Sequence, residues 1–336
     1  MTQTPVVLII FNRPELTGLV LNAIAEARPQ KLLVVADGPR RDRPGDLEAC
    51  EAARAVIDRV NWDCEVIKNY SDVNLGCGRR PATGISWAFE LAEEVIILED
   101  DCIPHPSFFR FCEELLERYR DDERVMHIGG SNVRREAVPT PDSYFFSQFN
   151  IAAGSWATWR RAWRHFDASV KLWPQLRDTS WLADRVEDER AVRYWAREFE
   201  AAYEREGNVS YWDHQWTFAC WANTGLSILP RTNLASNVGW GPDATHMSWE
   251  NDPTLNVPVS EMTFPLAHPR NVLQRREADR QFLREVVLPP LRRPSPLRVL
   301  ASRVAPKFVK RGYRKLAAAV GSAPVRRVSQ SFRSGL

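Results

Sequence analysis

Three consecutive carboxylates, Glu99, Asp100 and Asp101, directly follow the apolar run Val95 to Leu98. Adjacent negative charges repel one another, so keeping three together requires a positive partner. Hard divalent cations such as Mn²⁺ or Mg²⁺ prefer oxygen ligands, often one or two carboxylates, and leave their other positions to water and phosphate groups. The triplet therefore predicts a site for Mn²⁺ or Mg²⁺. The alternative is a solvated turn that precedes a helix beginning near Ser107.

The triplet stands at the end of one of five predicted strands. In the first half of the chain, short apolar runs alternate with segments of helical periodicity. Strands are expected at 5–11, 31–36, 64–68, 95–98 and 125–128, and helices at 15–27, 46–60, 81–94 and 106–119. This alternation indicates an α/β fold with a mostly parallel sheet flanked by helices.

Polar residues also follow two other predicted strands. Asn12 and Arg13 come after the first strand, and Asp37 and Gly38 after the second. Ligands of open α/β sheets bind at the carboxyl ends of the strands, so we expect these side chains to meet the acid triplet at one edge. The chain has no Walker A sequence and no GxGxxG after the first strand, which excludes the usual phosphate loops of ATPases and dinucleotide enzymes.

The composition is that of a soluble globular protein, with 44% hydrophobic and 26% charged residues among 336. The N-terminal segment lacks the basic region of a signal peptide, and no run of apolar residues is long enough to span a membrane. The six cysteines form no CxxC pair, which argues against a zinc site or a disulfide framework. We therefore expect a cytoplasmic protein.

The net charge of +2 conceals a strong asymmetry. Residues 291–336 hold twelve Lys or Arg and no acid, which leaves 33 basic and 43 acidic residues before position 291. Residues 296–320 mix aliphatic and basic side chains at helical spacing, a pattern that suits an anionic membrane surface. A partly disordered, solubilising tail is the alternative. We expect no nucleic-acid binding, because the tail has no binding fold and the acidic body repels phosphates.

The second half of the chain is rich in tryptophan. Eleven of the 13 tryptophans follow residue 155, and the regular alternation of strands and helices stops there. Trp156, Trp159 and Trp163 stand at positions i, i+3 and i+7, which predicts one packed helix face.

Four segments together resemble the GT-A fold glycosyltransferases: VVLIIFNRPE, LLVVADGPR, NLGCG and IILEDDCIPHPSFFRF. The resemblance spans about residues 5–250. It is greatest to bacterial family 2-type enzymes and to the N-acetylglucosaminyltransferase I group. This chain reads Glu-Asp-Asp rather than Asp-x-Asp, which is closer to N-acetylglucosaminyltransferase I than to most family 2 members. The resemblance implies one GT-A domain, in which residues 1–135 bind a nucleotide sugar and residues 136–290 bind the acceptor. The basic tail, residues 291–336, matches nothing in these families.

The resemblance implies a role for each polar strand end. Asp37 matches the residue that contacts the nucleotide base, with Gly38 beside it, and Asn12 and Arg13 match the lining of the nucleotide pocket. Asp101 matches the metal ligand. Glu99 and Asp100 match groups near the donor sugar and the ribose.

The segment VSYWDHQWTFACW resembles the part of these enzymes that supplies the catalytic base, although the spacing differs by one residue. Asp213 is then the expected base. The alternative is a helix N-cap, with Gln215 and Trp216 beginning the helix. His214 either supports Asp213 or lies on an exposed helix face.

Five further residues are candidates for contacts with the substrate or the metal. His246 is expected near the metal or the diphosphate, Trp240 as a stacking surface for a sugar, and Asn132 near the donor sugar. Arg79 and Arg80 are either phosphate contacts or solvated loop arginines, and we expect His105 to have a structural role.

The expected activity is inverting, metal-dependent transfer of a sugar from a nucleoside-diphosphate sugar, with a UDP-sugar favoured. The expected acceptor is a hydroxyl of a cell-envelope or lipid-linked glycan, which a tail on the inner membrane face would bring near. One alternative is a nucleotidyltransferase that forms sugar nucleotides, but its Gly-rich basic loop is missing after the first strand. Another is a carbohydrate-binding or scaffold protein that has lost its chemistry.

Overall fold

The computed structural model describes residues 1–150, 154–239 and 254–288. The chain divides into two compact units, Met1–Pro290 and Leu291–Leu336, and the second unit, which holds the basic tail, lies outside the described residues. None of the helices in the described part combines the length and the apolar character that crossing a bilayer requires.

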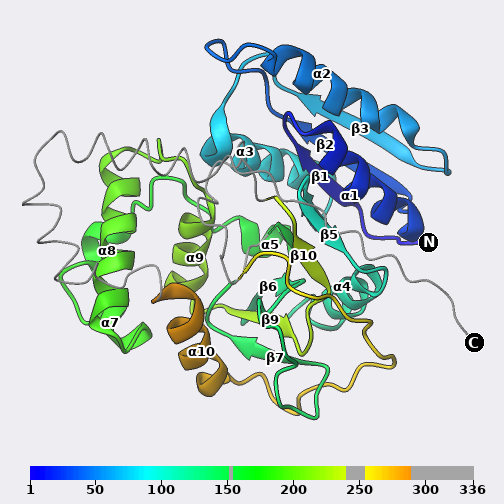
Figure 1. Cartoon of the computed structure of the whole chain (residues 1–336). Helices are drawn as coiled ribbons and strands as arrows, with labels where there is room; N and C mark the ends of the chain where they lie inside the picture. Colours follow the sequence, from blue (N-terminus) through cyan, green and yellow to red (C-terminus); the bar gives the residue numbers. More distant parts are fainter. Residues whose placement is uncertain (151–153, 240–253, 289–336) are drawn as a thin grey trace, which may run out of the picture. The chain divides into compact units, whose positions relative to one another are not determined.

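Strands and helices alternate through the first half of the larger unit and become less regular later (Figure 1). The strands are β1 (Val6–Ile10), β2 (Lys31–Ala36), β3 (Glu65–Tyr70), β4 (Glu94–Glu99), β5 (Cys102–Pro104), β6 (Val125–Gly129), β7 (Tyr144–Ser147), β8 (Ser155–Trp159), β9 (Leu226–Pro230) and β10 (Ala235–Asn237). The longer helices are α1 (Pro14–Ala27), α2 (Asp46–Ala55), α3 (Gly76–Leu91), α4 (Ser107–Arg118), α8 (Glu189–Glu204) and α9 (Asp213–Ala222). The shorter ones are η1 (Val56–Arg59), α5 (Arg160–Trp163), α6 (Trp173–Leu176), α7 (Trp181–Arg185), α10 (Arg276–Phe282) and η2 (Leu283–Val287).

The central sheet has eight strands in the order β3-β2-β1-β4-β8-β6-β9-β7. Only β7 and β8 run against the others, since β8 pairs antiparallel with both β4 and β6, and β7 pairs antiparallel with β9. The predicted α/β fold with a mostly parallel, helix-flanked sheet is therefore confirmed.

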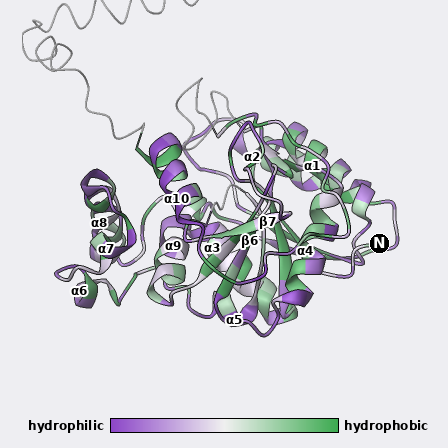
Figure 2. Ribbon diagram, turned by 90° about the horizontal axis from the view of Figure 1, so that it is seen from below, coloured by the Kyte–Doolittle hydropathy of each residue, from purple (hydrophilic) through white to green (hydrophobic). Residues whose placement is uncertain are grey.

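Each face of the sheet carries its own core because successive strand residues point to opposite sides. Leu8, Val34 and Leu98 belong to the core beneath α1 and α4. Their neighbours Ile9 and Val35 belong to the core beneath α3 and α9. Figure 2 shows the strands as a hydrophobic centre between helices that carry hydrophilic residues.

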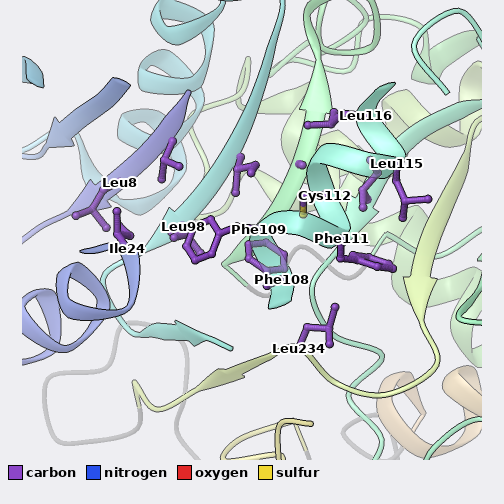
Figure 3. Close-up of a cluster of buried hydrophobic side chains, with 14 of the residues drawn as sticks. Leu8, Ile24, Leu98, Phe108, Phe109, Phe111, Cys112, Leu115, Leu116 and Leu234 are labelled. Atoms are coloured by element: carbon purple, nitrogen blue, oxygen red, sulfur yellow. The ribbon is translucent and has the colours of Figure 1, made fainter. Parts of the chain in front are cut away.

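Helix α4 fixes the turn that carries the acid triplet. Its buried residues recur at helical spacing and form one apolar stripe: Phe108, Phe109, Phe111, Cys112, Leu115 and Leu116. Figure 3 shows these side chains packed with Leu8 of β1 and Leu98 of β4. His105 Nδ1 accepts a hydrogen bond from the Ser107 backbone N–H (3.2 Å), which gives it a structural role at the start of the helix.

The predicted helix face of tryptophans is wrong. Trp156 and Trp159 lie in β8, and Trp163 lies in α5. Because an odd spacing places strand residues on opposite faces, Trp156 joins the core under α3 and Trp159 joins the core under α4. The prediction that these tryptophans pack in the core is confirmed, since all three are buried.

Helix α3 begins at Gly76 rather than near Pro81, so the segment predicted as a loop forms its first turn. Gly78 permits this turn to pack closely, because a Cβ there would lie 2.0 Å from the Val209 carbonyl oxygen. The six cysteines form no disulfide bonds with one another.

Candidate active site

A cavity of about 330 Å³ lies where β1, β2 and β4 end. The acid triplet, the 11–13 segment and the first turn of α3 contribute to its wall. Its polar and small lining residues are Asn12, Arg13, Asp37, Arg40, Asn74, Gly76, Cys77, Arg80, Glu99, Asp100, Asp101, Asn237 and Gly239. The structure thus brings together six residues that the sequence placed at one edge of the sheet: Asn12, Arg13, Asp37, Glu99, Asp100 and Asp101.

The three acids of the triplet have different partners. Asp101 Oδ2 accepts a hydrogen bond from Arg13 Nη1 at 2.8 Å, which forms a partly buried ion pair. Asp100 Oδ2 accepts the backbone N–H of Phe11 at 3.1 Å. The backbone N–H of Glu99 donates to the Gly154 carbonyl at 2.8 Å. A guanidinium therefore supplies positive charge to the triplet in this structure.

The environment of the triplet disfavours full ionisation. Burial, reinforced by the charges of Asp101, Asp100 and Asp213, raises the pKa of Glu99 well above its usual value, and Arg13 opposes this shift. Burial and the Asp101 charge raise the pKa of Asp100 to about 7, against the influence of Arg13 and the Phe11 N–H. A cation bound beside the triplet would favour the ionised forms of these acids.

The residues around Asp101 fit a divalent ion. The Arg13 guanidinium already stands as a cation at Asp101 Oδ2. Gly239 lies close against the same oxygen, because a Cβ built there would lie 1.9 Å from it. Within the described residues no group of three or more His, Cys, Asp or Glu side chains forms a metal site. Asp101 would therefore hold the ion with few protein ligands, as Mg²⁺ accepts.

Asp37 organises the start of α3. Its Oδ1 accepts the backbone N–H groups of Gly38 (2.9 Å) and Leu75 (2.8 Å). Its Oδ2 accepts the backbone N–H of Gly76 (2.9 Å) and the Asn74 amide (3.1 Å). Four donors occupy the acceptor capacity of one carboxylate, so a nucleotide base would have to displace one of them. Gly38 is needed here because a Cβ would lie 2.5 Å from the Val73 carbonyl carbon.

Asn12 and Arg40 converge on the buried Asp46. The Asn12 amide donates to Asp46 Oδ1 (2.6 Å), and Arg40 donates from Nη2 to Oδ1 (2.7 Å) and from Nε to Oδ2 (3.1 Å). The hydrogen bond from Arg40 lowers the pKa of Asp46 despite the opposing effect of burial. The Arg40 guanidinium also lies 5.1 Å from the Phe11 ring centroid, which fixes it in the cavity wall.

Asp213 is the first residue of α9, and the residue that caps this helix is Trp212. The alternative that places the N-cap at Asp213 is therefore wrong. Within the described part of the chain no hydrogen bond or ion pair reaches the Asp213 carboxylate. Its charge nevertheless raises the pKa of both Glu99 and Cys77, so it lies near the triplet. Asp213 itself is not among the residues that line the cavity.

The charges of both the acid triplet and Asp213 act on Cys77. Cys77 is exposed, but crowding by neighbouring atoms, followed by the charges of Glu99, Asp213 and Asp101, raises the pKa of its thiol. The thiol therefore remains protonated at neutral pH. Cys77 lines the cavity from the first turn of α3.

Several candidates either lie outside the lining of the cavity or have side chains that bond to other groups. Arg79 is exposed on α3, whereas Arg80 lines the cavity but donates to the Ala36 carbonyl (3.0 Å) and to Asn69 Oδ1 (2.7 Å). The amide of Asn132 donates to the Pro230 carbonyl at 2.7 Å and is buried away from the cavity. His214 Nε2 lies 3.0 Å from the Tyr194 hydroxyl, so it contacts α8 and has no hydrogen bond to Asp213. Trp240 and His246 lie outside the described residues.

Sequence reasoning missed several parts of the cavity wall. Arg40 follows Asp37 in the loop after the second strand, so its positive charge near a predicted strand end could have identified it as a lining residue. Cys77 was hidden because the first turn of α3 was predicted as a loop. Asn237 and Gly239 approach Asp101 through the pairing of β10 with β5, where the Val238 N–H donates to the Asp101 carbonyl at 2.8 Å. That pairing joins segments far apart in the chain.

No family model matches the chain, and no curated protein matches it in sequence. Among solved structures, it shares 11% identity and a TM-score of 0.30 with a UDP-glucose pyrophosphorylase complexed with UDP-glucose, over 48% of this chain and 78% of that one. It shares 11% identity and a TM-score of 0.36 with a UTP-bound UGPase from Acinetobacter baumannii, over 70% of this chain and 88% of that one. Scores this low carry no argument about function, which rests on the site itself.

Proposed function

We propose that this protein is an inverting glycosyltransferase of the GT-A type that uses a nucleoside-diphosphate sugar and Mn²⁺ or Mg²⁺. The observation that carries the proposal is the cavity at the ends of β1, β2 and β4. There three acids stand beside Arg13, and the available carboxylate of Asp213 lies nearby. The combination of a cation site with a separate candidate base supports group transfer from a diphosphate.

Each group has a distinct task in the proposed reaction. Asp101 would hold the divalent ion, which when bound would offset the charge of the departing diphosphate. Asn12 and the Asp37 segment would line the nucleotide pocket, and Glu99 and Asp100 would face the sugar and ribose. Asp213 would accept the proton of the acceptor hydroxyl late in the transfer, because a carboxylate is much less basic than an alkoxide. A base opposite the leaving group implies inversion at the sugar.

The acceptor belongs to the same proposal. A hydroxyl of a cell-envelope or lipid-linked glycan suits a chain whose residues 291–336 are basic and free of acids. Binding of this tail to an anionic membrane would hold the enzyme at the inner face, near such an acceptor.

The first test is a thermal-shift screen of UDP-, GDP-, dTDP- and CMP-sugars with and without Mn²⁺. A ligand that binds only the folded state raises the unfolding temperature according to its concentration and affinity. We expect a UDP-sugar to stabilise the protein more than the other donors, and to do so more strongly when Mn²⁺ is present. The absence of a shift with every donor would contradict the proposal.

The second test is the Asp101→Ala variant, with Asp72→Ala as the matched control because Asp72 is exposed and outside the cavity lining. Asp101→Ala should abolish Mn²⁺-stimulated hydrolysis of the donor, whereas Asp72→Ala should retain it. Release of UDP identifies glycosyl transfer or donor hydrolysis. Formation of UTP from the donor and pyrophosphate would identify the nucleotidyltransferase, and donor binding without turnover the inactive binding protein.

A further inference from the structure

We propose that the protein has a second binding site, a pocket between α7 and α10 in which Arg185 and Arg276 hold a phosphate group of the acceptor. The inference rests on the proposed function, because it assigns the phosphate to the molecule that receives the sugar. Free phosphate is the other source of the same chemistry.

The pocket has a volume of about 80 Å³ and, among the described residues, shares no lining residue with the cavity at the ends of β1, β2 and β4. One water molecule needs about 10–15 Å³ of such space, so the pocket admits a group of several atoms. Its charged lining residues are Asp184, Arg185, Glu187, Arg276, Asp279 and Arg280. Three acids and three arginines meet here, so their pairing decides which charges remain for a ligand.

Two of the acids have partners of their own. Glu187 accepts two parallel hydrogen bonds from Arg280, one from Nε and one from Nη2, both at 2.9 Å. Asp184 Oδ2 accepts the hydroxyl of Ser180 at 2.7 Å, within α7 and its first turn. Neither carboxylate forms an ion pair with Arg185.

The third acid, Asp279, is buried and fastens α10 to the end of β7. Its carboxylate accepts the Ser147 hydroxyl (2.5 Å), the Gln148 backbone N–H (3.2 Å) and the Gln274 amide (2.8 Å). Burial raises its pKa, and these three hydrogen bonds oppose the shift. Asp279 therefore has a structural role, and its partners are neutral donors rather than an arginine.

Arg185 is left without an acid. Within the part of the chain that the structure describes, its guanidinium takes part in no hydrogen bond or ion pair and lies 5.9 Å from the Trp181 ring centroid. Its backbone is fixed, because its carbonyl accepts the Gln148 amide at 2.8 Å. The side chain is half-buried, and burial lowers its pKa. A partly desolvated cation without a counter-ion is unfavourable, and a bound anion would supply the missing charge.

Arg276 brings a second guanidinium to the same pocket. It is the first residue of α10, it is exposed, and the described residues offer it no hydrogen bond or ion pair. A phosphate monoester carries about −1.5 to −2 charges at neutral pH, whereas a carboxylate carries one. Two guanidinium groups therefore match a phosphate better, and each can donate parallel hydrogen bonds to its oxygens.

The segment that follows β7 relates this pocket to Asp213. The Gln148 carbonyl accepts Trp221 Nε1 at 2.7 Å, and Asn150 Oδ1 accepts the Thr217 hydroxyl at 2.7 Å, so the segment runs along α9. Trp221 follows Asp213 by about two helical turns, or about 12 Å along the axis. A phosphate in the pocket is therefore remote from the reacting hydroxyl and would anchor another part of the acceptor.

The experiment titrates the full chain by isothermal titration calorimetry with sodium phosphate and, separately, with glucose 6-phosphate, at constant ionic strength. Arg185→Gln should weaken phosphate binding about tenfold, because charge-assisted hydrogen bonds are lost. Arg276→Gln should weaken it about threefold, since this guanidinium is exposed.

Arg193→Gln is the matched control. Arg193 is exposed on α8, forms an ion pair with Glu189 and is outside the pocket lining, so its loss should change phosphate affinity by no more than about twofold. The basic tail is present in every variant, so its contribution is the same in each titration. Thermal unfolding verifies that each variant is folded.

Unchanged phosphate affinity in Arg185→Gln, or an equal loss in Arg193→Gln, would overturn the inference. Binding of phosphate without binding of glucose 6-phosphate would overturn the acceptor's part in it, because the pocket would then take only free phosphate. If the variants behave as expected but the wild-type protein binds neither UDP nor a UDP-sugar with Mn²⁺, the phosphate pocket stands and the proposed function fails.

Discussion

The position of each acid in the triplet determines what it can do. Asp101 forms an ion pair with Arg13 through Oδ2, and Asp100 accepts a hydrogen bond from the backbone N–H of Phe11. The charge of Asp213 contributes to the raised pKa of Glu99. The sequence was sufficient to predict that these acids would meet Arg13, because parallel strands bring their carboxyl ends to one edge. The sequence was insufficient to predict the partners of Asp37. Its carboxylate accepts the backbone N–H groups of Leu75 and Gly76 at the start of α3, and both residues are far from it in the chain.

The space beside Asp101 gives a prediction at a single position. Gly239→Ala should weaken Mn²⁺ binding at least about tenfold, because the added methyl group would displace both Oδ2 and Cβ of Asp101, which lie 1.9 and 2.8 Å from the Cβ position. Calorimetry with MnCl₂ measures the effect.

Gly18→Ala is the control, since its Cβ would meet its nearest neighbour, Arg59, at an ordinary 3.6 Å. It should leave Mn²⁺ affinity unchanged and stabilise α1 by about 0.5–1 kcal/mol. Wild-type Mn²⁺ affinity in Gly239→Ala would show that Asp101 does not hold the ion.

Helices were predictable where their periodicity was strong and less so where a distant residue fixed their start. The spacing of Phe108, Phe111, Cys112 and Leu115 was enough to predict α4 behind the triplet. The start of α3 depends instead on Asp37 and on the contact between Gly78 and Val209. No local pattern carries that information.

The support that α4 gives to the triplet can be measured. Phe108→Ala should lower the free energy of unfolding by about 3–5 kcal/mol, because Phe108 is fully buried in the core that α4 shares with β4. Urea denaturation measures this loss. Leu47→Ala is the control, since Leu47 is 52% exposed on α2, and it should cost no more than about 0.5 kcal/mol. Similar losses in the two variants would mean that α4 does not anchor this part of the core.

At the scale of the molecule, both halves of the chain build one sheet. The five strands expected between residues 5 and 128 exist, with small shifts at their ends, and β7, β8 and β9 from residues 136–290 complete the sheet. The antiparallel entry of β8 between β4 and β6 was not predictable, because Trp156 and Trp159 have the spacing of a helix face. Their positions in β8 depend on packing into the two cores on opposite faces of the sheet, which local sequence does not reveal.

The charge asymmetry of the whole chain leads to a prediction about its ends. The full chain should sediment with anionic vesicles, less so at higher salt, because ions screen the basic tail. The compact unit 1–290 should remain in the supernatant, and vesicles of neutral lipid should retain neither protein. Equal sedimentation of the two proteins would remove the tail from the proposed localisation.

The pairing of β4 with β8 also determines the order in which the site can form during synthesis. Until residues 155–159 leave the ribosome, one edge of β4 has no partner, and Glu99 lacks the carbonyl of Gly154. The wall beside Asp101 is completed later still, when β10 pairs with β5 and brings Gly239 into place. A nascent chain can thus collapse around its first strands well before the cavity at their carboxyl ends is complete.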